Sequence, residues 1–251
     1  MAFYRAWYTP NNAVIVISGD VTAADVKPMV QRHFGALPSR ILPTRPDWKE
    51  PPRSANRTVS LSHPRVRQPS WSRRYLVPSY GASDRQYKYA LDVLTEILSG
   101  GTTGRLYRRL VVEQALAAHA GAWYSGDNRG PGVFGFYGSP RPGRTLDEIE
   151  TAIEVEIAAV LENGITDEEV KLAIERMQAE AVFARDSLNA PPRILGNALM
   201  SGQSIEDVEA WPERIGAVTK QAVDAAARAV LSTGGTVTTR LTPQSKPEKR
   251  S

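Results

Sequence analysis

The order in which strand-like and helix-like segments follow one another constrains this chain most. Short β-branched and aromatic stretches separated by turns come first, at 58–61, 70–77, 119–124 and 132–138. Apolar residues then recur at helical spacing through most of the remaining chain, until a closing strand over 236–241. This segregation predicts an α+β fold, in which a mostly antiparallel sheet carries helices on one face.

Capping residues mark where several of the expected helices begin and end. Thr22 is a suitable N-cap for the first, and Ser83-Asp84 for the second, which reaches Leu98. The Gly100-Gly101 pair ends the second helix, and Thr102-Thr103 can cap the third. The expected spans are 23–34, 84–98, 104–117, 146–162, 167–185, 193–200, 205–211 and 220–231.

The first 37 residues cannot form a domain by themselves. The run Ala13–Ser18 is continuous and β-branched, which is typical of a strand buried on both faces. One strand and one helix cannot bury a core, so we expect the neighbours of this strand to come from upstream or from another chain. We therefore divide the chain into four segments: a last strand-helix unit of a preceding domain (1–37), a proline-rich linker (38–56), a C-terminal domain (57–243) and a basic tail (244–251).

No cluster of residues in the sequence can run a reaction. The chain has no cysteine, which excludes a thiol nucleophile. Its three histidines, His33, His63 and His119, are too far apart in sequence to share one helix face as paired zinc ligands. Ser187 and Ser204 have no obvious histidine partner, so a serine triad is unsupported. We predict no catalytic residue and no metal ligand in this chain.

Three weaker signals have structural readings. Gly100–Arg105 is glycine-rich but lacks the lysine of a phosphate loop, so a helix C-cap explains it better. Carboxylate pairs such as Glu154/Glu156 are expected on solvated helix faces. The net charge of +4 is scattered, unlike the single basic face of a nucleic-acid-binding protein. No apolar run is long enough to span a bilayer.

Strand aromatics leave one binding mode open. We expect most of them to pack in the core, and some to line a groove that accepts a peptide by strand addition. They are Trp71, Tyr75, Trp123, Tyr124, Phe134, Phe136 and Tyr137.

Four stretches together resemble the insulinase/pitrilysin-like zinc peptidases, the family with the inverted His-x-x-Glu-His motif that includes mitochondrial processing peptidase. Together these stretches span nearly the whole chain, and their order and spacing resemble those of the C-terminal half of a bacterial two-domain member. They are Phe3–Val21, Gly100–Tyr107, Glu113–Ala117 and Ile215–Thr219 with Val223 and Ala225–Ala227.

The resemblance implies that the zinc chemistry lies elsewhere. In the family, zinc is held by the two motif histidines and a downstream glutamate, all preceding the segment that matches Tyr4–Val21. The second domain often adds an arginine and a tyrosine that hold the substrate backbone. Val111 and Ala118 occupy those two positions here, and neither side chain can donate a hydrogen bond. Arg109 and Tyr124 are nearby but out of register.

We therefore expect the C-terminal region of a zinc-dependent metalloendopeptidase, inactive by itself, that forms a wall of a peptide-binding chamber. The alternative is a non-catalytic scaffold or partner subunit of a peptidase-like complex. The expected partners are a peptide or unfolded polypeptide, the upstream domain and a homologous subunit, with no nucleic acid and no membrane span. Export to a bacterial periplasm is the location that the family favours.

Overall fold

A single mixed sheet organises the chain, whose computed structural model describes residues 1–45, 55–81 and 86–244. The strand order is β1-β5-β2-β4-β3. β1 and β5 run parallel, whereas the β5–β2, β2–β4 and β4–β3 pairs are antiparallel. The strands are β1 (Arg57–His63), β2 (Ser70–Val77), β3 (Ala117–Ser125), β4 (Gly132–Pro140) and β5 (Val237–Pro243).

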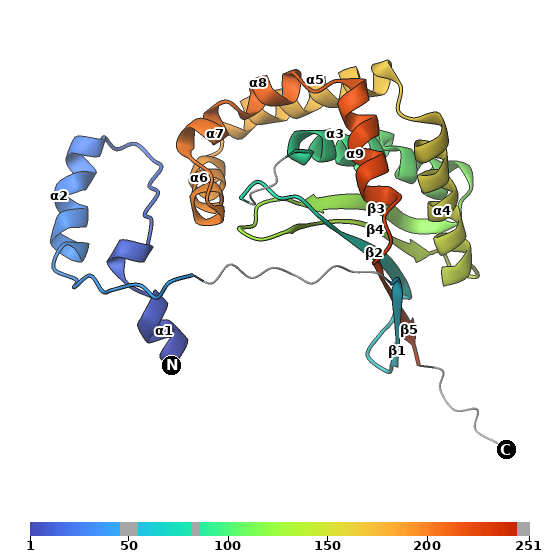
Figure 1. Cartoon of the computed structure of the whole chain (residues 1–251), viewed down its shortest axis with the longest axis horizontal. Coiled ribbons are helices and arrows are strands. Elements are labelled where there is room, and N and C mark those ends of the chain that lie inside the picture. The colour runs from blue at the N-terminus through green and yellow to red at the C-terminus, as the bar shows by residue number, and fades with distance from the viewer. Residues whose placement is uncertain (46–54, 82–85, 245–251) are drawn as a thin grey trace.

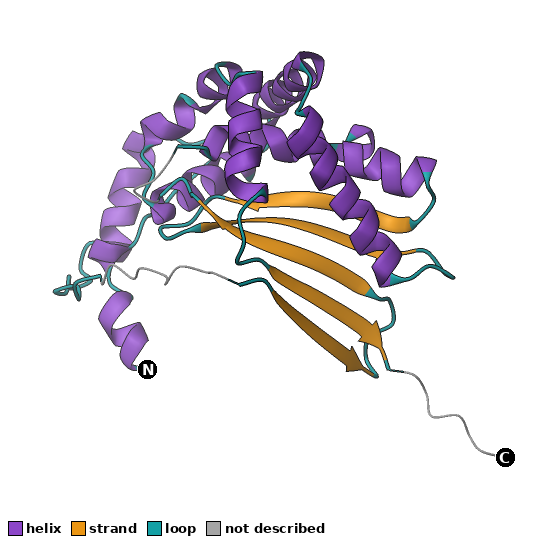
Figure 2. Cartoon of the chain, turned by 45° about the vertical axis from the view of Figure 1, so that its right-hand side comes forward, coloured by secondary structure: helices purple, strands orange, loops and turns teal. Residues whose placement is uncertain are grey.

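Helices cover one face of this sheet and leave the other uncovered (Figures 1 and 2). α3 packs on β3, α4 on β4 and β2, and α9 on β2, while α5 lies outside α3. This arrangement confirms the predicted α+β class. The helices of this layer are α3 (Lys88–Ser99), α4 (Leu146–Asn163), α5 (Asp167–Ala184), α6 (Ala190–Ser201), α7 (Ile205–Glu209), α8 (Trp211–Gly216) and α9 (Lys220–Leu231).

The core lies between the helices and the covered face. Trp71, Phe134 and Phe136 are each no more than 1% exposed and form its largest side chains on the sheet. Leu91 and Leu94 from α3 are fully buried against them. Each such burial contributes about 1.5–3 kcal/mol to folding, so this interface fixes which face of each strand points inward.

The N-terminal unit has no core of its own. α1 (Ala2–Trp7), the 3₁₀ turn η1 (Pro10–Asn12) and α2 (Ala23–Phe34) contain no buried residue. Thr22 caps α2 through a capping box, as expected. The strand expected over 13–18 joins no sheet among the described residues, and Val14, Ile15 and Ile17 are about half exposed. A β-branched run becomes a strand only where a neighbour completes its ladder.

The third helix was predicted wrongly. A 3₁₀ turn, η2 (Gly101–Thr103), leads into the π-helix η3 (Tyr107–Glu113), which ends four residues before the expected boundary at 117. Leu106 is its N-cap without a side-chain hydrogen bond, so the threonines do not cap it. The Ser83-Asp84 cap, residues 46–54 of the expected linker and residues 245–251 of the tail lie outside the described residues.

Candidate functional site

Neighbouring side chains on a strand point to opposite faces of the sheet, and the strand register assigns each residue to one of them. Arg73 is paired with Phe136 and Thr238 on the covered face. Arg74, one residue later, pairs with Gly135 on the uncovered face. Tyr137 pairs with Gly121 in that same uncovered layer.

Aromatic rings of β3 and β4 form a row on the uncovered face, and Arg74 of β2 extends this row. The Arg74 guanidinium lies 6.0 Å from the centre of the Trp123 ring. The rings of Trp123 and Tyr137 have centroids 6.0 Å apart, and His119 continues the row at 6.2 Å from Tyr137. We name Arg74, Trp123, Tyr137 and His119 the aromatic row.

Glycines let these rings lie close to the sheet backbone. A Cβ atom on Gly135 would lie 2.4 Å from the Trp123 ring, and one on Gly121 would lie 2.5 Å from the Tyr137 hydroxyl. Any larger residue at either position would push a ring away from the sheet. The aromatic row is therefore a platform that depends on glycine beneath it, and its neighbouring rings are tilted by 42° and 45° to one another.

The edge strand β1 borders the same uncovered face. It pairs with β5 on one side, and Val59 and Leu61 are 57% and 56% exposed. Among the described residues no strand lies on its other side. Such an edge presents unpaired N–H and C=O groups that can template another strand, so the uncovered face combines an aromatic platform with an open ladder.

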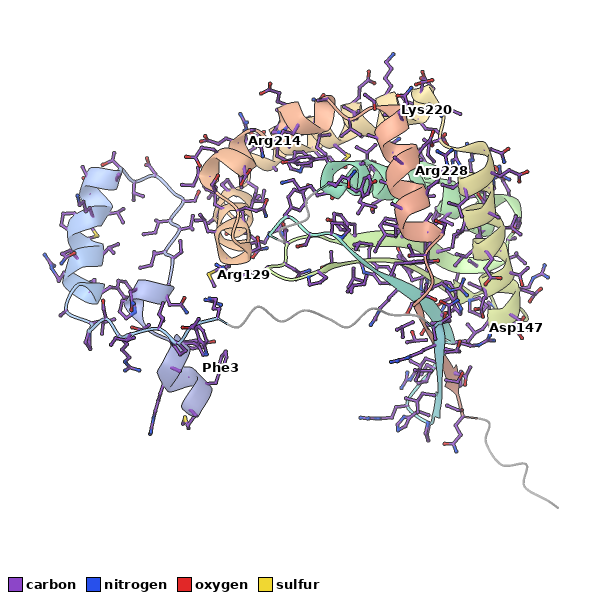
Figure 3. All side chains as sticks on the ribbon, in the orientation of Figure 1. Phe3, Arg129, Asp147, Arg214, Lys220 and Arg228 are labelled. Carbon is purple, nitrogen blue, oxygen red and sulfur yellow. The ribbon has the colours of Figure 1, made fainter. Side chains whose placement is uncertain are left out.

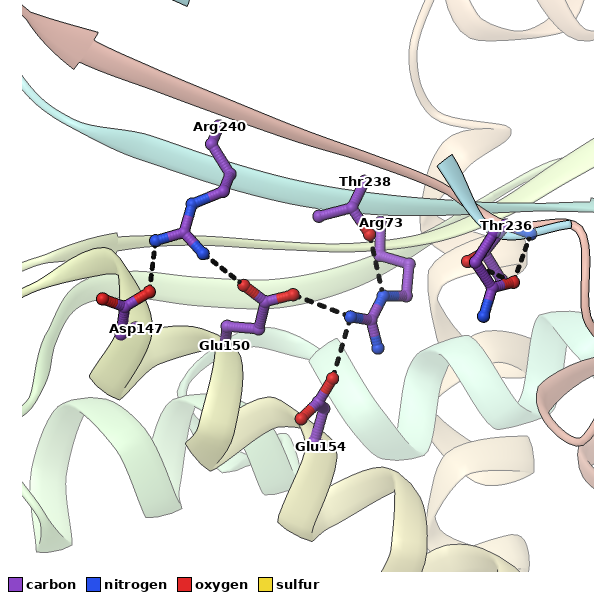
Figure 4. A network of polar contacts seen from close by, with 8 residues as sticks. Arg73, Asp147, Glu150, Glu154, Thr236, Thr238 and Arg240 are labelled. Carbon is purple, nitrogen blue, oxygen red and sulfur yellow. Dashed lines mark hydrogen bonds and ion pairs between the residues drawn. The ribbon is translucent and has the colours of Figure 1, made fainter. Parts of the chain in front are cut away.

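The covered face is closed electrostatically as well as sterically (Figure 4). The Arg73 guanidinium donates to Glu150 and Glu154 of α4 at 2.8 Å each, and its Nε donates to the Thr238 hydroxyl at 3.1 Å. Arg240 of β5 donates to Glu150 at 2.7 Å and also to Asp147. The acids of α4 thus neutralise both cations that the sheet turns toward it.

The two positions that the resemblance singled out flank a constrained turn, with Val111 in η3 and Ala118 in β3. Val111 is buried, whereas Ala118 is exposed beside a register shift in β3. Arg141 holds this turn, because its guanidinium donates to the carbonyl oxygens of Val111 at 2.8 Å and Ala117 at 3.1 Å. Ala115 adopts a positive φ of 50° in the turn, a conformation that favours glycine.

Arg109 and Tyr124 do not substitute for the missing pair. The Arg109 Nε lies 3.5 Å from a carboxylate oxygen of Glu156, and the Tyr124 hydroxyl donates to the Pro78 carbonyl at 2.7 Å. Of the pair expected on a solvated helix face, Glu154 is exposed as predicted, whereas the prediction for Glu156 was wrong. Glu156 is 3% exposed and Glu154 binds Arg73, because cations of η3 and β2 face α4.

The three histidines lie on separate elements. His33 is on α2, His63 ends β1 and His119 is on β3. In the described part of the chain, no group of three or more His, Cys, Asp or Glu side chains gathers in a way that could hold a metal ion. The donors present in these segments therefore do not fit a zinc site. Nor is any described helix long and apolar enough to cross a bilayer.

Gly100–Arg105 has the structural role expected of it. The Gly100 N–H donates to the Glu96 carbonyl at 2.7 Å and closes α3. Arg105 forms a bidentate ion pair with Glu169 at the start of α5. Its guanidinium is thus committed to a carboxylate of the same chain, which argues against phosphate binding here.

A buried polar cluster joins the end of β2 to α3 and α8. The Tyr80 hydroxyl donates to Asp92 and accepts from the Trp211 indole N–H at 3.1 Å. Burial raises the pKa of Asp92 to about 7 and also raises that of Tyr80. The Lys88 ammonium lies 4.9 Å from the Tyr80 ring centre. We regard this cluster as structural, because its donors and acceptors satisfy one another.

A hollow of about 1370 Å³ lies between the N-terminal unit and the β3–β4 turn. α1 contributes Phe3 and Trp7, and the other wall contains Arg129 and Met200. Arg129, which lies below α6 in Figure 3, donates from Nε to the Met200 carbonyl at 2.7 Å. This wall is therefore fixed to the helical layer.

Comparison with known proteins identifies the family behind this architecture. The sequence pattern of the peptidase M16 inactive domain matches residues 1–177. The chain belongs to the peptidase M16 inactive domain family. Among solved structures, this M16 domain is similar to a protease from Helicobacter pylori, with a TM-score of 0.87 and 21% identity over 96% of this chain and 58% of that one.

Two further relatives give the same result. A peptidase M16 inactive domain from Pseudomonas fluorescens aligns with a TM-score of 0.72 and 19% identity, over 90% of this chain and 52% of that one. An uncharacterized zinc protease of Streptomyces coelicolor, SCO5738, is 28% identical over 91% of this chain and 50% of its own length. The M16 domain thus spans about half the length of such curated relatives.

The sequence resemblance to this family is confirmed, but the aromatic row could not be predicted from it. Its rings belong to predicted strands, and the sequence alone does not say which face of the sheet they occupy. Two features of the sequence are consistent with the observed face: Phe136 and Tyr137 are neighbours on one strand, and glycines occur at 121 and 135. A glycine on one strand leaves room for a large ring from the strand beside it.

Proposed function

We propose that this chain is the C-terminal, non-catalytic region of a zinc-dependent metalloendopeptidase and forms a wall of the chamber that holds its polypeptide substrate. The uncovered sheet face carries this proposal. It offers the aromatic row and the open edge of β1, the two features through which an extended peptide binds a sheet. Similarity to a protein named as a zinc protease supports it.

In this proposal zinc and the catalytic base belong to an upstream half of the parent protein. The N-terminal unit is then the last strand and helix of that half, which would cover its exposed apolar residues. Ile15, Ile17, Met29 and Phe34 are each between 48% and 57% exposed. Their burial against an upstream sheet would supply the ladder that residues 13–18 lack.

Binding is tested directly on the 251-residue chain with an unfolded, casein-like polypeptide. We expect hydrogen exchange of amides in β1, β3 and β4 to slow when the polypeptide is present. Slowing confined to α5–α8, or none at all, would overturn the chamber-wall proposal. Cleavage is tested separately with zinc added, and we expect no turnover. Turnover that a chelator abolishes would contradict the non-catalytic assignment.

The second candidate is a scaffold or partner subunit of a peptidase-like complex. Val111 and Ala118 favour it, because neither can hold a substrate backbone through its side chain. Zinc content and peptide cleavage by a parent that includes the upstream half distinguish the two candidates. Stoichiometric zinc with turnover supports the peptidase region, whereas a metal-free, inactive parent supports the scaffold. A periplasmic location stays our prediction, and cell fractionation tests it.

A further inference from the structure

The five strands contain no acidic residue. Their charged side chains are Arg57, Arg73, Arg74 and Arg240, beside the histidines His63 and His119. In the described part of the chain, every aspartate and glutamate lies in a helix, a turn or a connecting segment. A sheet whose charged side chains are all basic attracts anionic groups to any face that is left open.

That preference is cancelled on the covered face. Arg73 and Arg240 meet Asp147, Glu150 and Glu154 of α4, as Figure 4 shows. The next residue, Arg74, is not neutralised in this way by any residue that the structure describes. Among the described residues, Arg74 has no carboxylate within ion-pair distance and lies instead over the Trp123 ring.

The open edge repeats the pattern. Arg57 begins β1, and Arg65 and Arg67 lie in the turn between β1 and β2, all three exposed. In the part of the chain that the structure describes, none of them contacts an acid within ion-pair distance. Between these cations lie the exposed apolar side chains of Val59 and Leu61.

We propose that the uncovered face selects extended polypeptide segments in which acidic residues alternate with apolar or aromatic ones. This inference rests on the proposed function and specifies which polypeptide substrates the chamber wall would bind. Arg74 and the arginines at the β1 edge take the carboxylates, since a guanidinium matches carboxylate geometry. The rings of Trp123, Tyr137 and His119 and the Val59–Leu61 surface take the apolar side chains.

The spacing of donors favours a polypeptide over other anions. β1 presents backbone N–H and C=O groups along seven residues, and an extended peptide has groups at the same repeat. Alternation along a bound strand would place every second side chain on the uncovered face beside Val59 and Leu61. Arg74 and the aromatic rings lie on β2, β4 and β3, so they would contact the part of the polypeptide that continues across the sheet. A nucleic acid would use the cations and the rings but leave this ladder empty.

Three dye-labelled peptides of 12 residues test the selection. They share the same apolar residues at alternate positions and carry glutamate, glutamine or lysine between them. We expect fluorescence anisotropy at low salt to rank their affinities glutamate, glutamine, lysine, with at least about tenfold between the extremes. We also expect this ratio to shrink as salt is added, because exposed charges are screened.

Arg74→Glu is the decisive variant. We expect it to weaken the acidic peptide about tenfold and leave the glutamine peptide nearly unchanged. Arg185→Glu, an equal charge change at the exposed end of α5, is the matched control and should alter neither peptide. Circular dichroism melting of both variants checks that each remains folded.

Each outcome has one meaning. Equal affinity for the three peptides would overturn the selection and leave the chamber-wall proposal standing, whereas no binding of any peptide would overturn both. Displacement of the acidic peptide by a single-stranded oligonucleotide at lower concentration would show a nucleic-acid surface and overturn the selection. Concentration-dependent self-association blocked by Arg74→Glu would show that a second copy occupies the face, which also overturns it.

Discussion

Adjacent residues on one strand meet opposite environments in this molecule. Phe136 is 1% exposed beneath the helices, whereas Tyr137 is 37% exposed on the uncovered face. Arg73 binds two glutamates and a threonine, whereas Arg74 rests on an aromatic ring. The same residue types thus stabilise the fold on one face and stay available for binding on the other.

The largest expected contrast is between Phe136→Ala and Tyr137→Ala. Phe136→Ala should lower the free energy of unfolding by about 3–5 kcal/mol, because it leaves a cavity in the core. Tyr137→Ala should cost about 1 kcal/mol or less, since its ring is partly in water already. Urea denaturation measures both, and equal costs would mean that the uncovered face is also part of the core.

A pH series on Asp92→Asn comes next. The folded pKa of Asp92, about 7, lies above its ordinary value of 3.8 because the carboxyl is buried. The protonated form therefore stabilises the fold below about pH 4, and this contribution is lost as the pH rises toward 7. Relative to wild type, the variant should gain about 2–4 kcal/mol between pH 4 and pH 8. A constant difference in melting behaviour across that range would contradict this.

Arg73→Ala and Arg74→Ala compare the effect on stability of removing a charged side chain from each face of the sheet. Arg73→Ala should cost about 1–3 kcal/mol, because it leaves the half-buried Glu150 without one of its partners. Arg74→Ala should change stability by less than about 0.5 kcal/mol, as expected for an exposed side chain. Thermal unfolding of the two variants side by side gives the answer, and a reversed order would refute the face assignment.

Gly135→Ala probes the platform itself. The added methyl group would displace the Trp123 ring, at an expected cost of about 1–2 kcal/mol. In a Trp123→Ala background the same change should cost much less, because the clash partner is gone. A double-mutant cycle by denaturant unfolding measures this coupling. Additive costs would show that the ring does not lie over Gly135.

The smallest effect is expected at the turn before β3. Ala115→Gly should stabilise the chain by about 0.5 kcal/mol, because relief of the positive φ slightly exceeds the added entropy of the unfolded chain. Ala118→Gly, at an exposed strand position, is the control and should destabilise slightly. Differential scanning calorimetry can resolve the opposite signs, and a loss at Ala115 would mean that the turn is unstrained.

Sequence reasoning succeeded where the determinants are local. The strand over 70–77 and the helix over 220–231 have the predicted bounds, since alternation and helical spacing are properties of neighbouring residues. The strand expected over Ala13–Ser18 has no neighbour among the described residues and stays a prediction, whereas the end of η3 was predicted wrongly. Arg141, a residue of the loop after β4, holds the turn that follows η3.

The candidate site was visible only in part. Composition and order led to the family, and the aromatic strand residues led to a peptide-binding hypothesis. The separation of Arg73 from Arg74 needed the register of three strands and the position of α4, which come from residues far apart in the chain. Local spacing cannot supply that information.

The position of β5 has a consequence for how the molecule assembles during synthesis. β5 lies between β1 and β2, so β1 cannot join the sheet until β5 has been synthesised. Until then the growing chain exposes the unpaired edges of β1 and β2, which later bind β5. Such late, long-range closure is slow, so we expect a newly made chain to be prone to aggregation until β5 has been synthesised and has paired.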